Sequence, residues 1–150
     1  MTYASTGNFK TPINETLKTL HSAGINKIEL SGGIYNRNLI KILKQYKNIF
    51  FSIHNYFPAP KKSIVLNLAS LNQGINNTTL DFMINSIKLV KRLGLKTYSF
   101  HAGFRIDPNI NELGKKINSA LIIQEKEACM KKFIENVNLL YKIANKLNIR

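Results

Sequence analysis

Two histidines close two similar short segments of the chain. His54 ends the apolar and aromatic run of residues 50–54, and His101 ends the run of residues 96–101. If both runs are neighbouring parallel strands, their last side chains meet at the edge where barrels and open α/β sheets carry their chemistry. Imidazole transfers protons near neutral pH and binds metal ions. The pattern predicts a functional site at His54 and His101, the alternative being a pair of buried, hydrogen-bonded histidines.

Three further polar side chains lie close to the expected strand ends. Glu29 supplies a carboxylate for proton transfer if it faces the site, but strand alternation allows either direction. Asn55 directly follows His54, and we assign it to substrate binding. The planar guanidinium of Arg105 suits a phosphate or carboxylate, although an ordinary ion pair in the loop is the alternative. We predict Glu29 and His101 as catalytic residues, with Asn55 and Arg105 as substrate contacts.

Strand-like and helical patterns alternate along the whole chain. Strand-like runs cover residues 2–6, 27–31, 49–54 and 96–101, and apolar residues at helical spacing follow them in 11–24, 39–43, 76–94 and 130–147. The alternation predicts an α/β protein with a parallel sheet and right-handed crossovers. Both faces of such a sheet must be covered. A doubly wound open sheet and part of a (βα)8 barrel, with its helices on the outside, both satisfy this requirement.

Composition limits the classes of protein to consider. With 150 residues and 44% hydrophobic residues, we expect a single soluble domain over residues 1–150. The chain has no apolar run long enough to span a membrane and only one cysteine, which favours a cytoplasmic protein without a membrane partner. Its net charge is +14, but the lysines are scattered singly or in pairs, so we interpret them as a solvated surface and expect no nucleic-acid partner.

Four segments of the chain resemble a known group of barrels. Residues 52–54 together with 65–70 look like its third strand and the following loop, 100–103 like its fourth strand, and 28–33 like its second. The group is the xylose-isomerase-like TIM-barrel superfamily, which includes sugar isomerases, sugar-phosphate epimerases and type IV AP endonucleases. A complete barrel needs about 250 residues. The resemblance therefore implies a (βα)4 segment, the N-terminal half of a barrel with strands and helices one to four.

The resemblance also implies an activity. In such enzymes the histidines of strands three and four contribute to, or lie beside, a divalent-metal site, which implies Zn, Mn, Mg or Co held by His54 and His101. The expected protein is a sugar or sugar-phosphate isomerase or epimerase, incomplete because further ligands come from strands five to eight. It would bind a small sugar or sugar phosphate and form a homodimer or pair with a missing C-terminal half. Two alternatives remain: a metal-dependent AP endonuclease that repairs DNA, and a catalytically silent half barrel that dimerises.

Overall fold

A computed structural model describes residues 2–112 and 123–150 of the chain. They form two compact units. The first holds residues up to Lys61 together with Ser86–Phe100 and Ile149–Arg150, and the second holds Lys62–Asn85 and the described part of His101–Asn148. The assignment of residues 1–150 to a single domain stays a prediction.

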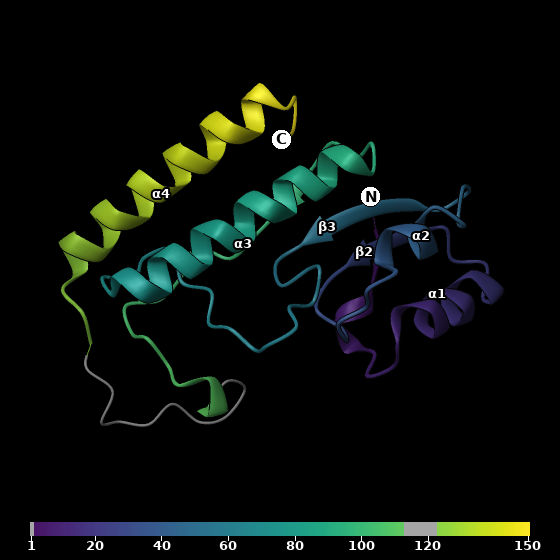
Figure 1. Ribbon diagram of the computed structural model, residues 1–150, viewed down its shortest axis with the longest axis horizontal. Helices are drawn as coiled ribbons and strands as arrows, with labels where there is room; N and C mark the ends of the chain where they lie inside the picture. The colour runs from purple at the N-terminus through teal and green to yellow at the C-terminus, as the bar shows by residue number, and fades with distance from the viewer. Residues whose placement is uncertain (1, 113–122) are drawn as a thin grey trace. The chain divides into compact units, whose positions relative to one another are not determined.

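Strands and helices alternate through the described residues (Figure 1). Most elements lie in the first unit: β1 (Ala4–Ser5), the 3-10 helix η1 (Thr6–Asn8), α1 (Ile13–Ser22), β2 (Lys27–Leu30), α2 (Leu39–Leu43), β3 (Phe50–His54) and β4 (Tyr98–Ser99). The second unit holds the 3-10 helix η2 (Ile110–Glu112) and α4 (Lys126–Lys146), and α3 (Gln73–Arg92) begins in the second unit and ends in the first. Among the helices of the described residues, none combines the length and apolar character needed to cross a bilayer.

The four strands form one parallel sheet in the order β1-β2-β3-β4. Each strand is hydrogen-bonded to the strand that precedes it in the sequence, as in a barrel. A doubly wound sheet instead reverses its strand order at a switch point. The fold is therefore α/β and partial TIM-barrel-like, which confirms the predicted (βα)4 segment.

One face of the sheet contributes to the core of the first unit. Leu30 of β2 is paired with Ile53 of β3, and both side chains are fully buried, as is Ile28. Alternation along a strand places these residues on one face. Helix α1 forms because its apolar residues recur at helical spacing, and it buries Ile13, Thr16, Leu17 and Leu20 along one side.

The observed element ends differ from the predicted ones in several elements, among them β1, β4 and α3. Strands β1 and β4 have only two residues each, because pairing stops where the chain turns away into η1 and into the segment after Phe100. Helix α3 begins at Gln73, earlier than predicted, since the Asn72 Oδ1 accepts hydrogen bonds from the backbone N–H groups of Gly74 and Ile75. An asparagine in this position caps a helix N-terminus.

Candidate functional site

The face of the sheet opposite the buried Ile28, Leu30 and Ile53 is mostly polar, the exposed Phe50 at the start of β3 being an exception. Glu29 is paired with Ser5 of β1 and with Ser52 of β3, and His54 is paired with Ser99 of β4. Because paired residues of parallel strands share a face and His54 lies two residues after Ser52, Glu29 and His54 point to the same side. We call this set the polar face: Ser5, Glu29, Ser52, His54 and Ser99.

The ring of His54 is held in place by the neighbouring strand. Its Nδ1 lies 3.0 Å from the Oγ of Ser99, and this Oγ also lies 3.5 Å from the carbonyl oxygen of Ile53. A hydrogen bond at one ring nitrogen sets the orientation of the other. The side chain of His54 is half-buried. The structure therefore positions one predicted site residue at the carboxyl end of β3, oriented by Ser99.

Hydrogen bonds connect the ends of β1, β2 and β3. The Oγ1 of Thr6 donates to the carbonyl oxygen of Ser31 at 3.0 Å and accepts from the Ser31 N–H at 2.9 Å. The Oγ of Ser31 donates to the carbonyl oxygen of Asn55 at 3.4 Å. These contacts fix the chain where it leaves the three strands.

Asn55 lies beneath the surface at the end of β3. Its side chain is 4% exposed, and its Oδ1 is buried with no hydrogen-bond partner among the described residues. Tyr56, the next residue, has a φ of 61°, which is uncommon for a bulky residue. Buried acceptors without a partner are rare in proteins, and strained backbone clusters at functional sites. Both observations set the end of β3 apart from an ordinary turn.

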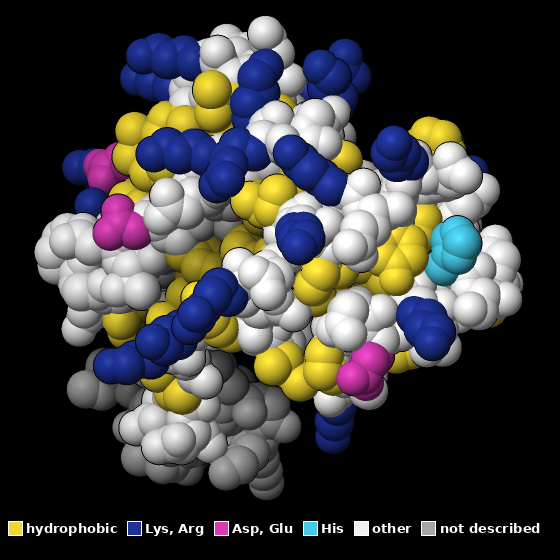
Figure 2. All heavy atoms as spheres, turned by 45° about the vertical axis from the view of Figure 1, so that its right-hand side comes forward, with side chains coloured by type: hydrophobic (Ala, Val, Ile, Leu, Met, Phe, Trp, Pro, Cys, Tyr) yellow, Lys and Arg dark blue, Asp and Glu magenta, His cyan; other side chains and the backbone are white. Residues whose placement is uncertain are grey.

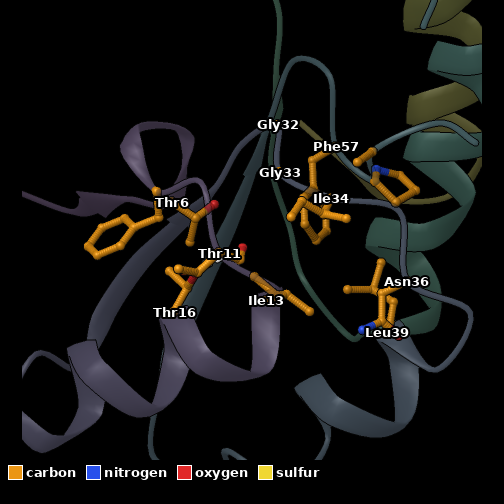
Figure 3. Close-up of a pocket in the computed structure, with 13 residues that line it drawn as sticks. Thr6, Thr11, Ile13, Thr16, Gly32, Gly33, Ile34, Asn36, Leu39 and Phe57 are labelled. Carbon is orange, nitrogen blue, oxygen red and sulfur yellow. Dashed lines mark hydrogen bonds between the residues drawn. The ribbon is translucent and has the colours of Figure 1, made fainter. Parts of the chain in front are cut away.

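A small pocket lies among the loops that follow β1, β2 and β3 (Figure 3). Hydroxyls of Thr6, Thr11 and Thr16 line it together with apolar side chains that include Phe57. It leaves about 10 Å³ for the centres of water molecules, which is room for about one water. A sugar therefore does not fit this pocket in the observed conformation. We take the polar face as the candidate site because two predicted site residues, Glu29 and His54, lie on it together.

The second unit contains the other two predicted site residues. His101 and Arg105 are both exposed. The Nε of Arg105 donates to the carbonyl oxygen of Gln124 at 3.1 Å, and the neighbouring carboxylate of Asp107 is engaged by uncharged donors instead. Among the described residues, Arg105 therefore forms no ion pair. The prediction that His54 and His101 share one site stays a prediction.

The donor chemistry of the polar face is compatible with a divalent metal ion. Imidazole and carboxylate are both ligands of such ions, and a metal-binding histidine usually engages a partner through its other ring nitrogen, as His54 does with Ser99. Within residues 2–112 and 123–150, no group of three or more His, Cys, Asp or Glu side chains is close enough together to hold a metal. The polar face thus holds two side chains of the ligand type, Glu29 and His54, which is fewer than such a group contains.

The fold is that of part of a TIM barrel. Several solved structures have a similar fold. The chain is similar to a D-psicose 3-epimerase from Clostridium cellulolyticum, solved with D-tagatose (TM-score 0.63, 12% identity, covering 97% of this chain and 49% of that one). It is also similar to a D-tagatose 3-epimerase-like protein (TM-score 0.67, 14% identity, covering 100% and 51%). A third match is a Thermus thermophilus protein soaked with ZnCl2 (TM-score 0.58, 16% identity, covering 99% and 53%).

These matches confirm the resemblance to xylose-isomerase-like TIM barrels at the level of fold. The chain spans about half the length of the solved proteins it matches. No model of a protein family matches the sequence. No curated protein matches it either.

Sequence reasoning missed most of the polar face and all of a second cluster around Asn67. Ser52 lies beside the buried Ile53 and Ser99 beside the buried Tyr98, and this alternation was the available signal, whereas Ser5 has no buried apolar neighbour in the sequence. Asn67 is completely buried and makes five side-chain hydrogen bonds, four of them to residues 104–107. No pattern in the sequence indicates pairing of segments so far apart.

Proposed function

We propose that the chain is an isomerase- or epimerase-like protein whose substrate is a small ketose or its phosphate. The observation that supports this best is the common direction of Glu29 and His54, near the carboxyl ends of parallel strands. Catalytic groups of TIM-barrel enzymes lie at this end of the strands. The solved 3-epimerases that share the fold favour the same chemistry.

The proposed reaction moves a proton at the carbon next to a carbonyl group. The Glu29 carboxylate accepts the proton from this carbon, and the electron pair of the broken C–H bond passes into the carbonyl, giving an enolate. His101, as imidazolium, returns a proton to the opposite side of the same carbon, which inverts it. The pair of residues regains its original charge by exchanging protons with solvent. General acid–base catalysis of this kind contributes about 10²- to 10⁴-fold in rate.

The other predicted residues bind and orient the substrate in this proposal. The buried Oδ1 of Asn55 accepts a hydrogen bond from a sugar hydroxyl, which would satisfy an acceptor that has no other partner. Arg105 holds a phosphate through the guanidinium nitrogens beyond its Nε. His54 would hold a divalent metal ion, and His101 would be a second ligand only in its neutral form, in which it does not act as the proton donor. When bound, the ion supplies positive charge that polarises carbonyl and hydroxyl oxygens.

The experiment that tests this function is exchange of a carbon-bound proton with solvent. Proton NMR in D₂O follows deuterium incorporation next to the carbonyl of D-tagatose, D-fructose and their phosphates, with Mn²⁺, Zn²⁺, Mg²⁺ or Co²⁺ added in turn. We expect exchange with the wild-type protein and a decrease of about 100-fold or more in Glu29→Gln, because an amide cannot accept the proton. His54→Ala and His101→Ala should decrease both exchange and metal binding.

Matched controls separate the site from general effects of substitution. Glu15 is in the first turn of α1 and His21 in its last turn, and neither belongs to the polar face. Glu15→Gln and His21→Ala should therefore retain exchange. If Glu29→Gln retains exchange, the proposed role of Glu29 is wrong. A folded wild-type protein that exchanges no substrate proton would favour the non-catalytic alternative.

A further inference from the structure

Two sequence motifs that carry the resemblance contact each other in the second unit. Asn67 belongs to the segment 65–70, and its side chain reaches the segment that follows His101. Its Nδ2 donates to the carbonyl oxygens of Phe104 and Ile106 at 3.0 and 3.1 Å, and its Oδ1 accepts from the Phe104 N–H at 2.8 Å. One fully buried amide thus fixes both the donor and the acceptor of the Phe104 backbone.

Asp107 extends the same cluster. Its Oδ1 lies 2.7 Å from the Asn67 Nδ2, and its Oδ2 accepts from the Ser70 Oγ at 2.8 Å and from the Gln124 Nε2 at 2.6 Å. Hydrogen bonds to an ionised carboxylate are about twice as strong as neutral ones. We call Asn67, Ser70, Asp107 and Gln124 the clamp.

Gly103 shows how closely the two segments approach. It has a φ of +129°, and a Cβ added there would lie 2.5 Å from the Asn67 Oδ1 and 3.0 Å from the backbone nitrogen of Ala69. Only glycine adopts this conformation and leaves this space. His101 lies two residues before Gly103, and Arg105 lies two residues after it. The clamp therefore holds the backbone on both sides of Arg105, and the close approach at Gly103 lies two residues from His101.

We propose that Asn67 and Asp107 are positioning residues, which act by holding residues 103–107 so that His101 and Arg105 keep one orientation. The hydrogen bonds of the clamp hold this backbone in one conformation. Gln124 also restrains the Arg105 side chain, because its carbonyl oxygen accepts a hydrogen bond from the Arg105 Nε. The effect on ligand binding rests on the proposed function, whereas the effect on the Arg105 side chain does not.

The first test observes the loop directly. In the wild-type protein, the Arg105 Nε–H should give a distinct NMR signal whose exchange with solvent is slowed by its hydrogen bond. Asn67→Ala should speed this exchange, and that of the Phe104 amide, by about tenfold or more. Asn136→Ala is the matched control, since Asn136 is also buried in the second unit but donates to Leu68 and not to residues 103–107. Equal exchange in wild type and Asn67→Ala would overturn the proposal.

The second test measures Mn²⁺ affinity by calorimetry in a double-mutant cycle. We expect Asn67→Ala to weaken binding by about tenfold when His101 is present and to have no further effect in the His101→Ala background. An equal loss in both backgrounds would show that Asn67 does not act through His101, and would overturn the proposal. If Asn67→Ala does not fold, Asp107→Asn is the second variant. It removes the charge of the clamp and replaces one of its two acceptor oxygens with a donor, and both measurements apply to it. A wild-type protein that binds no Mn²⁺ would contradict the proposed metal site, and the Arg105 and Phe104 signals would still decide whether the clamp exists.

Discussion

Glu29 illustrates how the direction of one side chain depends on its neighbours. The sequence left both faces of the strand open to it, and the pairing of β2 with β3 places it with Ser52, on the face opposite the buried Leu30 and Ile53. Asn55 was predicted from its place next to His54, but its buried oxygen without a partner was not predictable. Burial depends on the packing of segments far apart in the sequence, which local patterns do not contain.

Gly103 and Gly94 provide a comparison at the scale of a single residue. Both have a positive φ, but a Cβ at Gly94 would have no atom within 4 Å, whereas at Gly103 it would lie 2.5 Å from the Asn67 Oδ1. We expect Gly94→Ala to decrease the free energy of unfolding by about 1 kcal/mol, the cost of the left-handed conformation. Gly103→Ala should decrease it by about 2 kcal/mol or more, because steric overlap is added. Urea denaturation measures both, and equal losses would contradict the close approach.

At the scale of elements, helical spacing predicted the positions of the four helices, while the strand lengths were overestimated. Strand-like composition in residues 96–101 extends beyond β4, which pairs with β3 only at Tyr98–Ser99. A strand ends where its hydrogen-bonded neighbour ends, and this is a property of the sheet. The N-cap of α4 was also not predicted, since glutamate is not among the residues that usually cap helices.

Glu125, the N-cap of α4, should make the stability of the folded protein depend on pH in the acid range. Hydrogen bonding with the Glu127 side chain, and with the backbone N–H groups of Ala128 and Glu127, lowers the pKa of Glu125 to about 2 from its ordinary value of 4.5. A lowered pKa in the folded state stabilises the protein above pH 4.5, and this contribution disappears as the pH decreases towards 2. Glu125→Gln should therefore give a melting temperature that changes less between pH 5 and about pH 2.

Circular dichroism at 222 nm measures this change. The control is Glu135→Gln, because Glu135 lies in the same helix and pairs with Lys132 at its surface. This variant should keep the acid sensitivity of the wild-type protein. Identical pH profiles for wild type and Glu125→Gln would show that the cap does not contribute.

At the scale of the whole molecule, composition and alternation were sufficient for the α/β class, and the resemblance was needed to favour a barrel segment over a doubly wound sheet. Neither specified the partners. Figure 2 shows Lys and Arg side chains spread over the drawn face with hydrophobic side chains between them, in keeping with the interpretation of the +14 charge as a solvated surface. The expectations of a cytoplasmic location, of no nucleic-acid partner, and of pairing with a second copy or a C-terminal half stay predictions. They depend on other molecules, which neither the sequence pattern nor the fold specifies.

Mapping of a ketose-binding surface by NMR tests the central claim most directly. Titration of the isotope-labelled protein with D-tagatose, in the presence of Mg²⁺, reports which backbone amides sense the ligand. We predict saturable shifts concentrated at Ser5, Glu29, Ser52, His54 and Ser99, which Glu29→Gln weakens and Glu15→Gln does not. Saturable shifts confined to the helices, or no shifts at any sugar concentration, would contradict the assignment of the site to the polar face.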